Sequence, residues 1–144
     1  MPLHLIKLCV GVDTIRELED WIAEKRRRTG REGGEHVHVT RMMPKRHEAL
    51  TDGGSLYWVI RGQLACRQRL AAVRPITDSS GVARCELVLD PAVVPVAPRS
   101  CGPFQGWRYL DPRDTPPDLA GHEAASLATM PESLRRELVE LGLL

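Results

Sequence analysis

Seven basic side chains and a Tyr-Trp pair fall within one stretch of this sequence, residues 41–74, which holds only two acidic side chains. The whole chain is nearly neutral, with 20 Lys and Arg against 19 Asp and Glu. Guanidinium and ammonium groups bind phosphate, and an indole ring stacks on nucleobases, so the combination suits a nucleic acid, RNA more than DNA. The candidate contact residues in this stretch are Arg41, Lys45, Arg46, Trp58, Arg67 and Arg69.

The spatial relation of these residues depends on a β-hairpin predicted from residues 56–60 and 63–73. Both segments are rich in strand-forming residues, and the Arg-Gly pair between them is short enough for a two-residue turn. Such a turn sets Trp58 opposite Ala65 and places the indole on the same side of the sheet as the two arginines of the second strand. The alternative is that Trp58 belongs to the core, because a one-residue change of register exchanges the two faces.

The three cations before the hairpin flank Pro44. Proline stiffens the chain, so a loop of this kind loses less entropy when it binds phosphate, and residues 45–50 could form a single helical turn beside it. The alternative is that these side chains are simply solvated.

A second aromatic pair, Trp107 and Tyr109, flanks Arg108. Seven prolines between residues 90 and 117 argue against a regular ladder there, and we expect 104–110 to be an extended segment docked on the sheet. In an extended strand Trp107 and Tyr109 share a side and Arg108 faces away. Trp107 is therefore a candidate for a second stacking position, with Arg108 as a further cation. Alternatively, the rings seal one end of the core.

His36 and His38 raise the possibility of a metal site, because strand alternation puts both imidazoles on one face. A third ligand would have to come from Cys66, Cys85 or His122. None of these has the short ligand spacing of zinc modules, so we expect no metal and no other cofactor. The alternative function would be a metal-dependent enzyme acting on a nucleotide or a small phosphorylated ligand.

A third possibility is a protein interaction module. Residues 111–144 carry seven acidic side chains against three basic ones, which complements the basic stretch. Two copies could pair head to tail through these regions, so a homo-oligomer is possible. The sequence has no run of eighteen apolar residues and no signal peptide pattern, which predicts a cytoplasmic protein without a membrane segment.

The predicted elements indicate a single domain, residues 1–144, with an α+β fold. Thr14 and Glu17 have the spacing of a capping box, and the apolar periodicity that follows predicts a helix at 14–28. A similar pattern predicts a second helix at 131–141. The predicted strands are residues 3–10, 36–41, 56–60, 63–73 and 82–89. Consecutive strands with short connections indicate a small, strongly bent antiparallel sheet or a partly open β-barrel with two flanking helices.

Short strings across nearly the whole chain carry a resemblance to a known family; they are residues 7–11, 40–46, 53–62, 67–69, 89–91, 104–110 and 116–119. Together they resemble a bacterial family, found mainly in alphaproteobacteria, that is catalogued as a domain of unknown function. The resemblance implies a soluble single-domain protein and brings no activity and no functional residue.

A second, architectural resemblance rests on the Gly-Gly turn at 53–54 and the hairpin that follows it. This arrangement is similar to the central hairpin of PUA-like barrels, including the ASCH and EVE branches, which bind RNA or modified bases. The Gly-x-Lys-x-x-Glu-x-Arg string associated with the ASCH branch does not occur. The resemblance implies a PUA-like fold whose ligand lies beside Arg41, Lys45, Arg46, Trp58 and Arg67.

Overall fold

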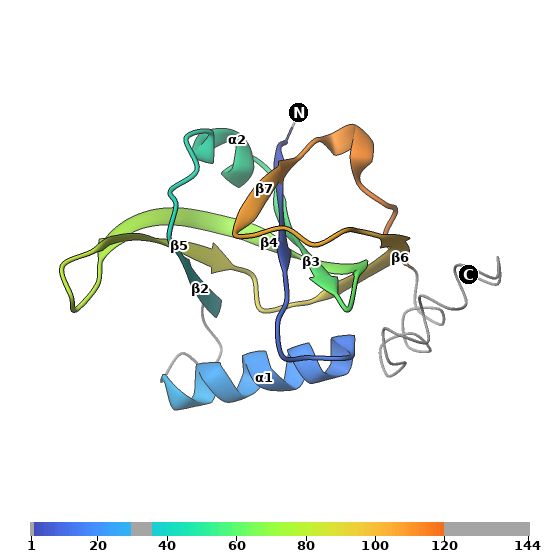
Figure 1. The fold of residues 1–144 in the computed structure, drawn as a ribbon, viewed down its shortest axis with the longest axis horizontal. Helices are drawn as coiled ribbons and strands as arrows, with labels where there is room; N and C mark the ends of the chain where they lie inside the picture. Colours follow the sequence, from blue (N-terminus) through green and yellow to red (C-terminus); the bar gives the residue numbers. More distant parts are fainter. Residues whose placement is uncertain (1, 30–35, 120–144) are drawn as a thin grey trace.

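The computed structural model of this chain describes residues 2–29 and 36–119. Within them it shows an open, bent sheet with one long helix across one end and a short helix at the other (Figure 1). The elements in chain order are β1 (His4–Leu8), α1 (Ile15–Arg28), β2 (His36–Thr40), α2 (His47–Thr51), β3 (Ser55–Ile60), β4 (Gln63–Thr77), β5 (Ala83–Leu89), β6 (Val94–Ser100), β7 (Trp107–Leu110) and a 3-10 turn (Pro112–Asp114). The α+β class expected from the sequence is confirmed. The second helix predicted at 131–141 lies outside the described residues.

The sheet has the strand order β2-β5-β4-β3-β1-β7, and β6 pairs with β4 beside that path. It is mixed rather than purely antiparallel, because β1 runs parallel to β3. The segment between these two strands contains both helices and β2, and a crossover of that length lets the chain return in the same direction. Expecting only antiparallel pairs was therefore wrong for this pair of strands.

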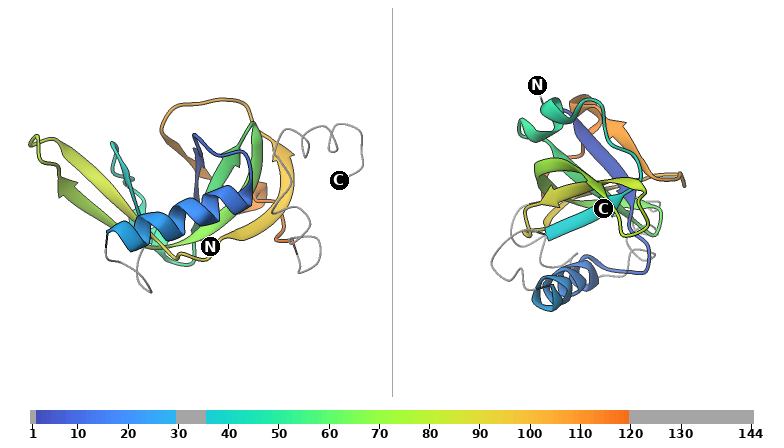
Figure 2. Two further views of the ribbon diagram at one scale, coloured as in Figure 1. Left: turned by 90° about the horizontal axis from the view of Figure 1, so that it is seen from below. Right: turned by 90° about the vertical axis from the view of Figure 1, so that its left-hand side faces the viewer.

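Strand β4 is the longest element of the sheet and is responsible for its bend. Its first part, up to Arg69, pairs with β3, whereas its second part, from Leu70 on, pairs with β5. The register shifts between Leu70 and Ala72, a β-bulge that locally increases twist. As a result the far ends of β4 and β5 project as an arm away from the rest of the molecule (Figures 1 and 2).

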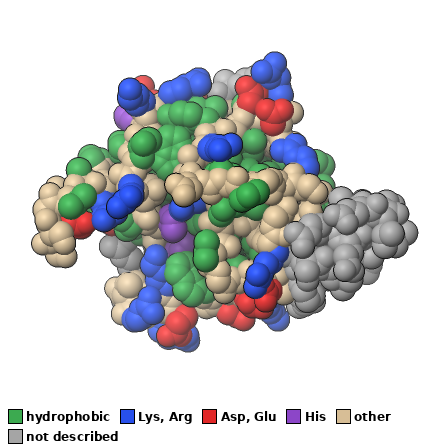
Figure 3. All heavy atoms as spheres, in the orientation of Figure 1, with side chains coloured by type: hydrophobic (Ala, Val, Ile, Leu, Met, Phe, Trp, Pro, Cys, Tyr) green, Lys and Arg blue, Asp and Glu red, His purple; other side chains and the backbone are tan. Residues whose placement is uncertain are grey.

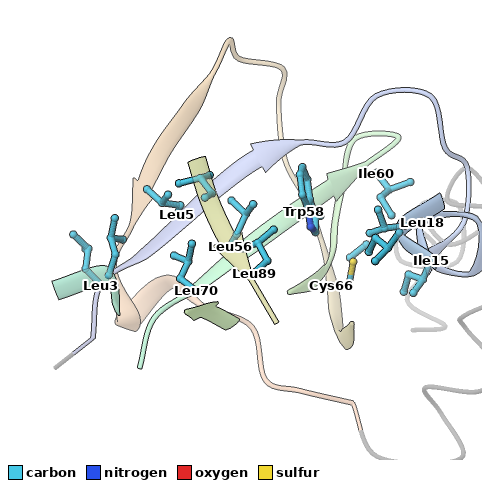
Figure 4. Packing of buried hydrophobic residues seen from close by; sticks show 14 of the residues in the cluster. Leu3, Leu5, Ile15, Leu18, Leu56, Trp58, Ile60, Cys66, Leu70 and Leu89 are labelled. Carbon is cyan, nitrogen blue, oxygen red and sulfur yellow. The ribbon is translucent and has the colours of Figure 1, made fainter. Parts of the chain in front are cut away.

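Helix α1 begins where the sequence predicts it. The Thr14 hydroxyl accepts a hydrogen bond from the Glu17 backbone N–H at 3.0 Å, which caps the first turn. The apolar stripe of Ile15, Leu18 and Ile22 is buried in the same core as Trp58 and Ile60, and Figure 4 shows Ile15 and Leu18 next to Ile60. Four consecutive basic residues occupy the last turn, where they complement the negative end of the helix dipole.

All six residues of β3 are buried, because both faces of this strand are covered. Leu56, Trp58 and Ile60 point into a core formed with α1 and α2, while Tyr57 and Val59 point into a second core on the other face. Strand β3, the first strand of the hairpin, therefore has no solvent-exposed side.

The structure contains one strand that proline content led us not to expect. β6 includes Pro95 and Pro98 and pairs with β4. Along its other edge, the described residues form two further backbone hydrogen bonds, from the Ala97 N–H to the Pro117 carbonyl and from the Leu119 N–H to the Pro95 carbonyl. Proline is tolerated there because β6 needs few N–H donors. Among the described residues, no helix has the length and apolar character required to cross a membrane.

Candidate nucleic-acid interface

The segment of residues 41–46 packs against β7, which brings two distant parts of the sequence together. The indole Nε1–H of Trp107 donates to the Met42 carbonyl at 2.8 Å, and the backbone N–H of Arg46 donates to the Tyr109 hydroxyl at 3.1 Å. The two rings are in edge contact, with centroids 5.0 Å apart. These contacts hold the 41–46 segment in one conformation beside the rings. We call the resulting set the basic–aromatic surface; its members are Arg41, Lys45, Arg46, Trp107 and Tyr109.

The cations of this surface are exposed, and Arg41, Lys45 and Arg46 form no ion pair with any residue of the described ranges. The Arg46 guanidinium lies 6.0 Å from the centroid of the Tyr109 ring, within the range of a cation–π contact. Figure 3 shows basic and hydrophobic side chains together over the part of the molecule where α2 and β7 lie.

In the described part of the chain, the Asp111 carboxylate lies within electrostatic reach of this surface. A side-chain hydrogen bond from Arg113 is the main cause that lowers the pKa of Asp111, and Arg46 lowers it slightly further. The Arg113 guanidinium is already bonded to Asp111, at 3.1 Å. The acid is thus mainly paired with a cation outside the surface.

The alternation expected for residues 107–109 is present. Trp107 and Tyr109 share one side of β7 and make a T-shaped contact, whereas the Arg108 guanidinium lies over the Phe104 ring, 4.8 Å from its centroid. Trp107 is half-buried and packs against the core, and Tyr109 remains 38% exposed. Trp107 therefore serves partly to seal the core, and Tyr109, which we had not selected, is the more accessible ring. Its presence two residues after Trp107 on a strand was the signal available in the sequence.

Trp58 does not belong to any exposed surface, and predicting it as a stacking residue was wrong. Its side chain is 3% exposed and lies among Leu5, Leu56 and Leu89 (Figure 4). Its indole Nε1–H donates to the Gln68 side-chain oxygen at 2.9 Å, so the polar atom of the ring is satisfied internally. The ring therefore contributes to no exposed face of the hairpin, although it borders a cleft between α1 and the sheet.

The cause of this error is a β-bulge one residue long. The turn pairs Ile60 with Gln63 as expected, but the register shifts after Val59, and Trp58 pairs with Cys66 instead of Ala65. Because of the extra residue, every later side chain of β4 lies on the opposite face of the sheet from the one that the uninterrupted register predicts. Trp58 therefore lies on one face of the sheet and the two arginines of β4 lie on the other.

The remaining candidate cations are dispersed. Arg67 is held by Asp118 through hydrogen bonds of 2.9 and 2.7 Å and also donates to the Ser55 hydroxyl at 3.0 Å. Arg69 is exposed opposite Ser55 without an ion pair to any described residue, and Arg108 faces away from Trp107 on β7. None of the three lies on the basic–aromatic surface.

Gln68 connects Trp58 to His36 and to the backbone of Asp90. Because the indole N–H can only donate, the Gln68 oxygen must face Trp58 and its nitrogen must face the other two partners. That nitrogen lies 3.2 Å from His36 Nδ1 and 2.9 Å from the Asp90 carbonyl. Nδ1 of His36 is therefore an acceptor, and the imidazole is neutral with its proton on Nε2.

The two histidines considered as metal ligands share a face of β2 as expected. His36 touches the Trp21 ring, and His38 stands edge to face against Trp58 with centroids 5.2 Å apart. In the described ranges, no group of three or more His, Cys, Asp or Glu side chains is placed to hold a metal ion. Cys66 and Cys85 are buried in the apolar core, and the third possible ligand, His122, lies outside the described residues.

Comparison with known proteins identifies the family but not an activity. The chain belongs to the family described as "Protein of unknown function (DUF1489)", which it matches over residues 5–144. No curated protein and no solved structure matches the chain. Any functional conclusion about this DUF1489 protein must therefore come from the geometry of its own residues.

Proposed function

We propose that this protein binds nucleic acid, single-stranded RNA in preference to DNA, through the basic–aromatic surface. The observation that carries the proposal is the contact between residues 41–46 and β7. It places three cations that have no ion pair among the described residues beside an accessible phenol ring and a half-buried indole. Cations of this kind bind phosphates, and exposed rings stack on unpaired bases.

Two features favour a single strand over a duplex. The rings lie on a strand, β7, and the helix next to them in the described part of the chain, α2, is five residues long, too short to fill a major groove. The segment that carries the cations is fixed before binding by its hydrogen bonds to Trp107 and Tyr109. A fixed segment loses little entropy on binding, which favours affinity.

The test is the binding of a fluorescently labelled single-stranded RNA, followed by anisotropy between about 50 and 200 mM salt. Replacing the three cations by glutamine, as R41Q/K45Q/R46Q, should lower the affinity and reduce the slope of log affinity against log salt by about 2, since each phosphate contact contributes about 0.7. Tyr109→Ala should remove a stacking contribution of about 1–3 kcal/mol.

The matched control removes the same charge from the opposite end of the molecule, on α1, as R16Q/R27Q/R28Q. It should leave the salt slope nearly unchanged if the surface is specific. Binding that is absent at the lowest salt, or two triple variants with equal slopes, would rule out the proposal. Parallel titrations with DNA of the same sequence test the preference for RNA.

A further inference from the structure

A cleft of about 320 Å³ opens between α1 and the sheet, on the face opposite to Arg67. This volume lies at the lower end of the range for small-molecule sites, about 300–1,000 Å³. The cleft is separate from the basic–aromatic surface, because none of that surface's residues lines it. The side chains that matter for its chemistry are Cys9, Val12, Leu18, Trp21, His38 and Trp58.

The walls are apolar and aromatic. Leu18 and Trp58 belong to the buried core, and Val12 packs against it. Trp21 lies at the rim on α1 and is 44% exposed, although it is a large aromatic residue. An apolar pocket with a few polar groups is the usual form of a ligand site.

His38 is the polar group of the cleft, and its hydrogen-bonding capacity is not met. Its Nε2 atom is shielded from solvent and has no hydrogen-bond partner in the described ranges. Burial, followed by Lys7 and Lys25, lowers the pKa of His38 to about 4, so the ring is neutral at pH 7. A buried polar atom without a partner costs about 1–3 kcal/mol, and a ligand's polar group at this imidazole would recover part of that cost.

Two ammonium groups make the cleft electropositive. Lys7 pairs in register with Trp58 on the neighbouring strand, so both side chains project from the same face of the sheet. Lys25 donates to the Val37 carbonyl at 2.7 Å, and its ammonium lies 5.0 Å from the centroid of the Trp21 ring. Both lysines contribute to the lowered pKa of His38, and Trp21 and Trp58, beside which they lie, line the cleft.

We propose that this cleft binds a small planar aromatic molecule that carries one carboxylate. The ring would lie against Trp58, Leu18 and Trp21, and the carboxylate would face His38 and the two lysines. The apolar walls account for the ring, and the positive charge accounts for the carboxylate. The inference does not rest on nucleic-acid binding, because it uses different residues.

The experiment is an NMR titration with indole-3-carboxylate as the probe. The chain has three tryptophans, and their indole N–H signals can be assigned with the Trp21→Phe and Trp107→Phe variants. Binding in the cleft should shift the Trp58 and Trp21 signals saturably with a dissociation constant near or below about 1 mM, while the Trp107 signal serves as an internal reference. Indole-3-carboxamide, which lacks the charge, and cyclohexanecarboxylate, which lacks the planar ring, should each bind at least fivefold more weakly.

Two variants separate a specific site from surface adsorption. Val12→Phe fills the cleft and should reduce the affinity at least tenfold, whereas Val82→Phe on the β4–β5 turn should not change it. Lys25→Gln should weaken the binding of indole-3-carboxylate but not the binding of indole-3-carboxamide. The proposal is overturned if no signal shifts saturably, if Trp107 shifts most, or if Val12→Phe binds as well as the original chain while its spectrum shows that it is folded.

Discussion

Trp58 and Trp107 project from the same face of the same sheet, on either side of Lys7, yet one is core and the other borders a surface. Lys7 of β1 pairs with Trp58 of β3 on one side and with Trp107 of β7 on the other. Trp58 lies on an inner strand and donates its N–H to a buried side chain. Trp107 lies at the edge and donates to the Met42 carbonyl. The position of the strand in the sheet, and not the local sequence, separates their roles.

The polar partners of the two rings differ in the same way. Around Trp58, Gln68 satisfies the indole N–H and links it to the buried, neutral His36. Trp107 instead donates to the Met42 carbonyl and meets the ring of Tyr109, over which the exposed Arg46 guanidinium lies. A ring that is fully packed stabilises the fold, whereas a ring beside exposed cations is available for a ligand. Loss of Trp58 should therefore affect mainly stability, and loss of Trp107 should affect mainly the binding of nucleic acid at the basic–aromatic surface.

The largest expected effect is the loss of stability on Trp58→Ala. Removing a fully packed indole should cost about 3–5 kcal/mol, and it also leaves Gln68 without its donor. Trp107→Ala should cost less than half of that, because this ring is only half-buried. Urea denaturation followed by circular dichroism compares the two variants. Equal losses of stability in the two variants would show that Trp58 is no more tightly packed than Trp107, contrary to their positions in the sheet.

Stability should also depend on pH, with a smaller change per pH unit than the loss on Trp58→Ala. Burial, then Lys25 and Arg26, lowers the pKa of His36 to about 4, and His38 is lowered to the same value. The unfolded chain, with a histidine pKa near 6.5, binds more protons than the folded chain between about pH 4 and 6.5. Stability should therefore be complete above about pH 6.5 and should fall toward pH 4, by up to about 1.4 kcal/mol per pH unit for each histidine.

The variant that checks this assignment is His36→Gln. It removes one titrating group, so the free energy of unfolding should vary less steeply between pH 4 and 6.5. Unfolding by urea at several pH values gives the slopes directly. A variant with the original slope would mean that His36 is not the group that titrates in this window.

The alternation of Trp107, Arg108 and Tyr109 could be predicted, because the period of a strand is local and fixed. The two-residue turn was also predictable; Arg61 and Gly62 both adopt positive φ, at 50° and 79°. The bulge at Ala65 was not, since either register leaves a largely apolar face and only packing against α1 selects one. The docking of residues 41–46 on β7 could not be predicted either, because its two hydrogen bonds join residues that are 63 and 65 positions apart in the sequence.

The smallest expected effect concerns Arg67, which the bulge moves away from Trp58. Arg67 is held by Asp118, and the hydrogen bond between them is the main cause of the raised pKa of Arg67 and of the lowered pKa of Asp118. Because the pair is partly exposed, Asp118→Asn should cost only about 0.2–1 kcal/mol of stability.

The same pair tests which arginines are available to a polyanion. Arg67→Gln should change RNA affinity less than twofold, because the Arg67 guanidinium already donates hydrogen bonds to the Asp118 carboxylate and to the Ser55 hydroxyl. Arg46→Gln should weaken binding and lower the salt dependence, because this exposed guanidinium lies over the Tyr109 ring and forms no ion pair with any described residue. If the Arg67 variant instead lost as much affinity as the Arg46 variant, the ligand would have to approach the opposite face of the sheet, and the basic–aromatic surface would no longer account for binding.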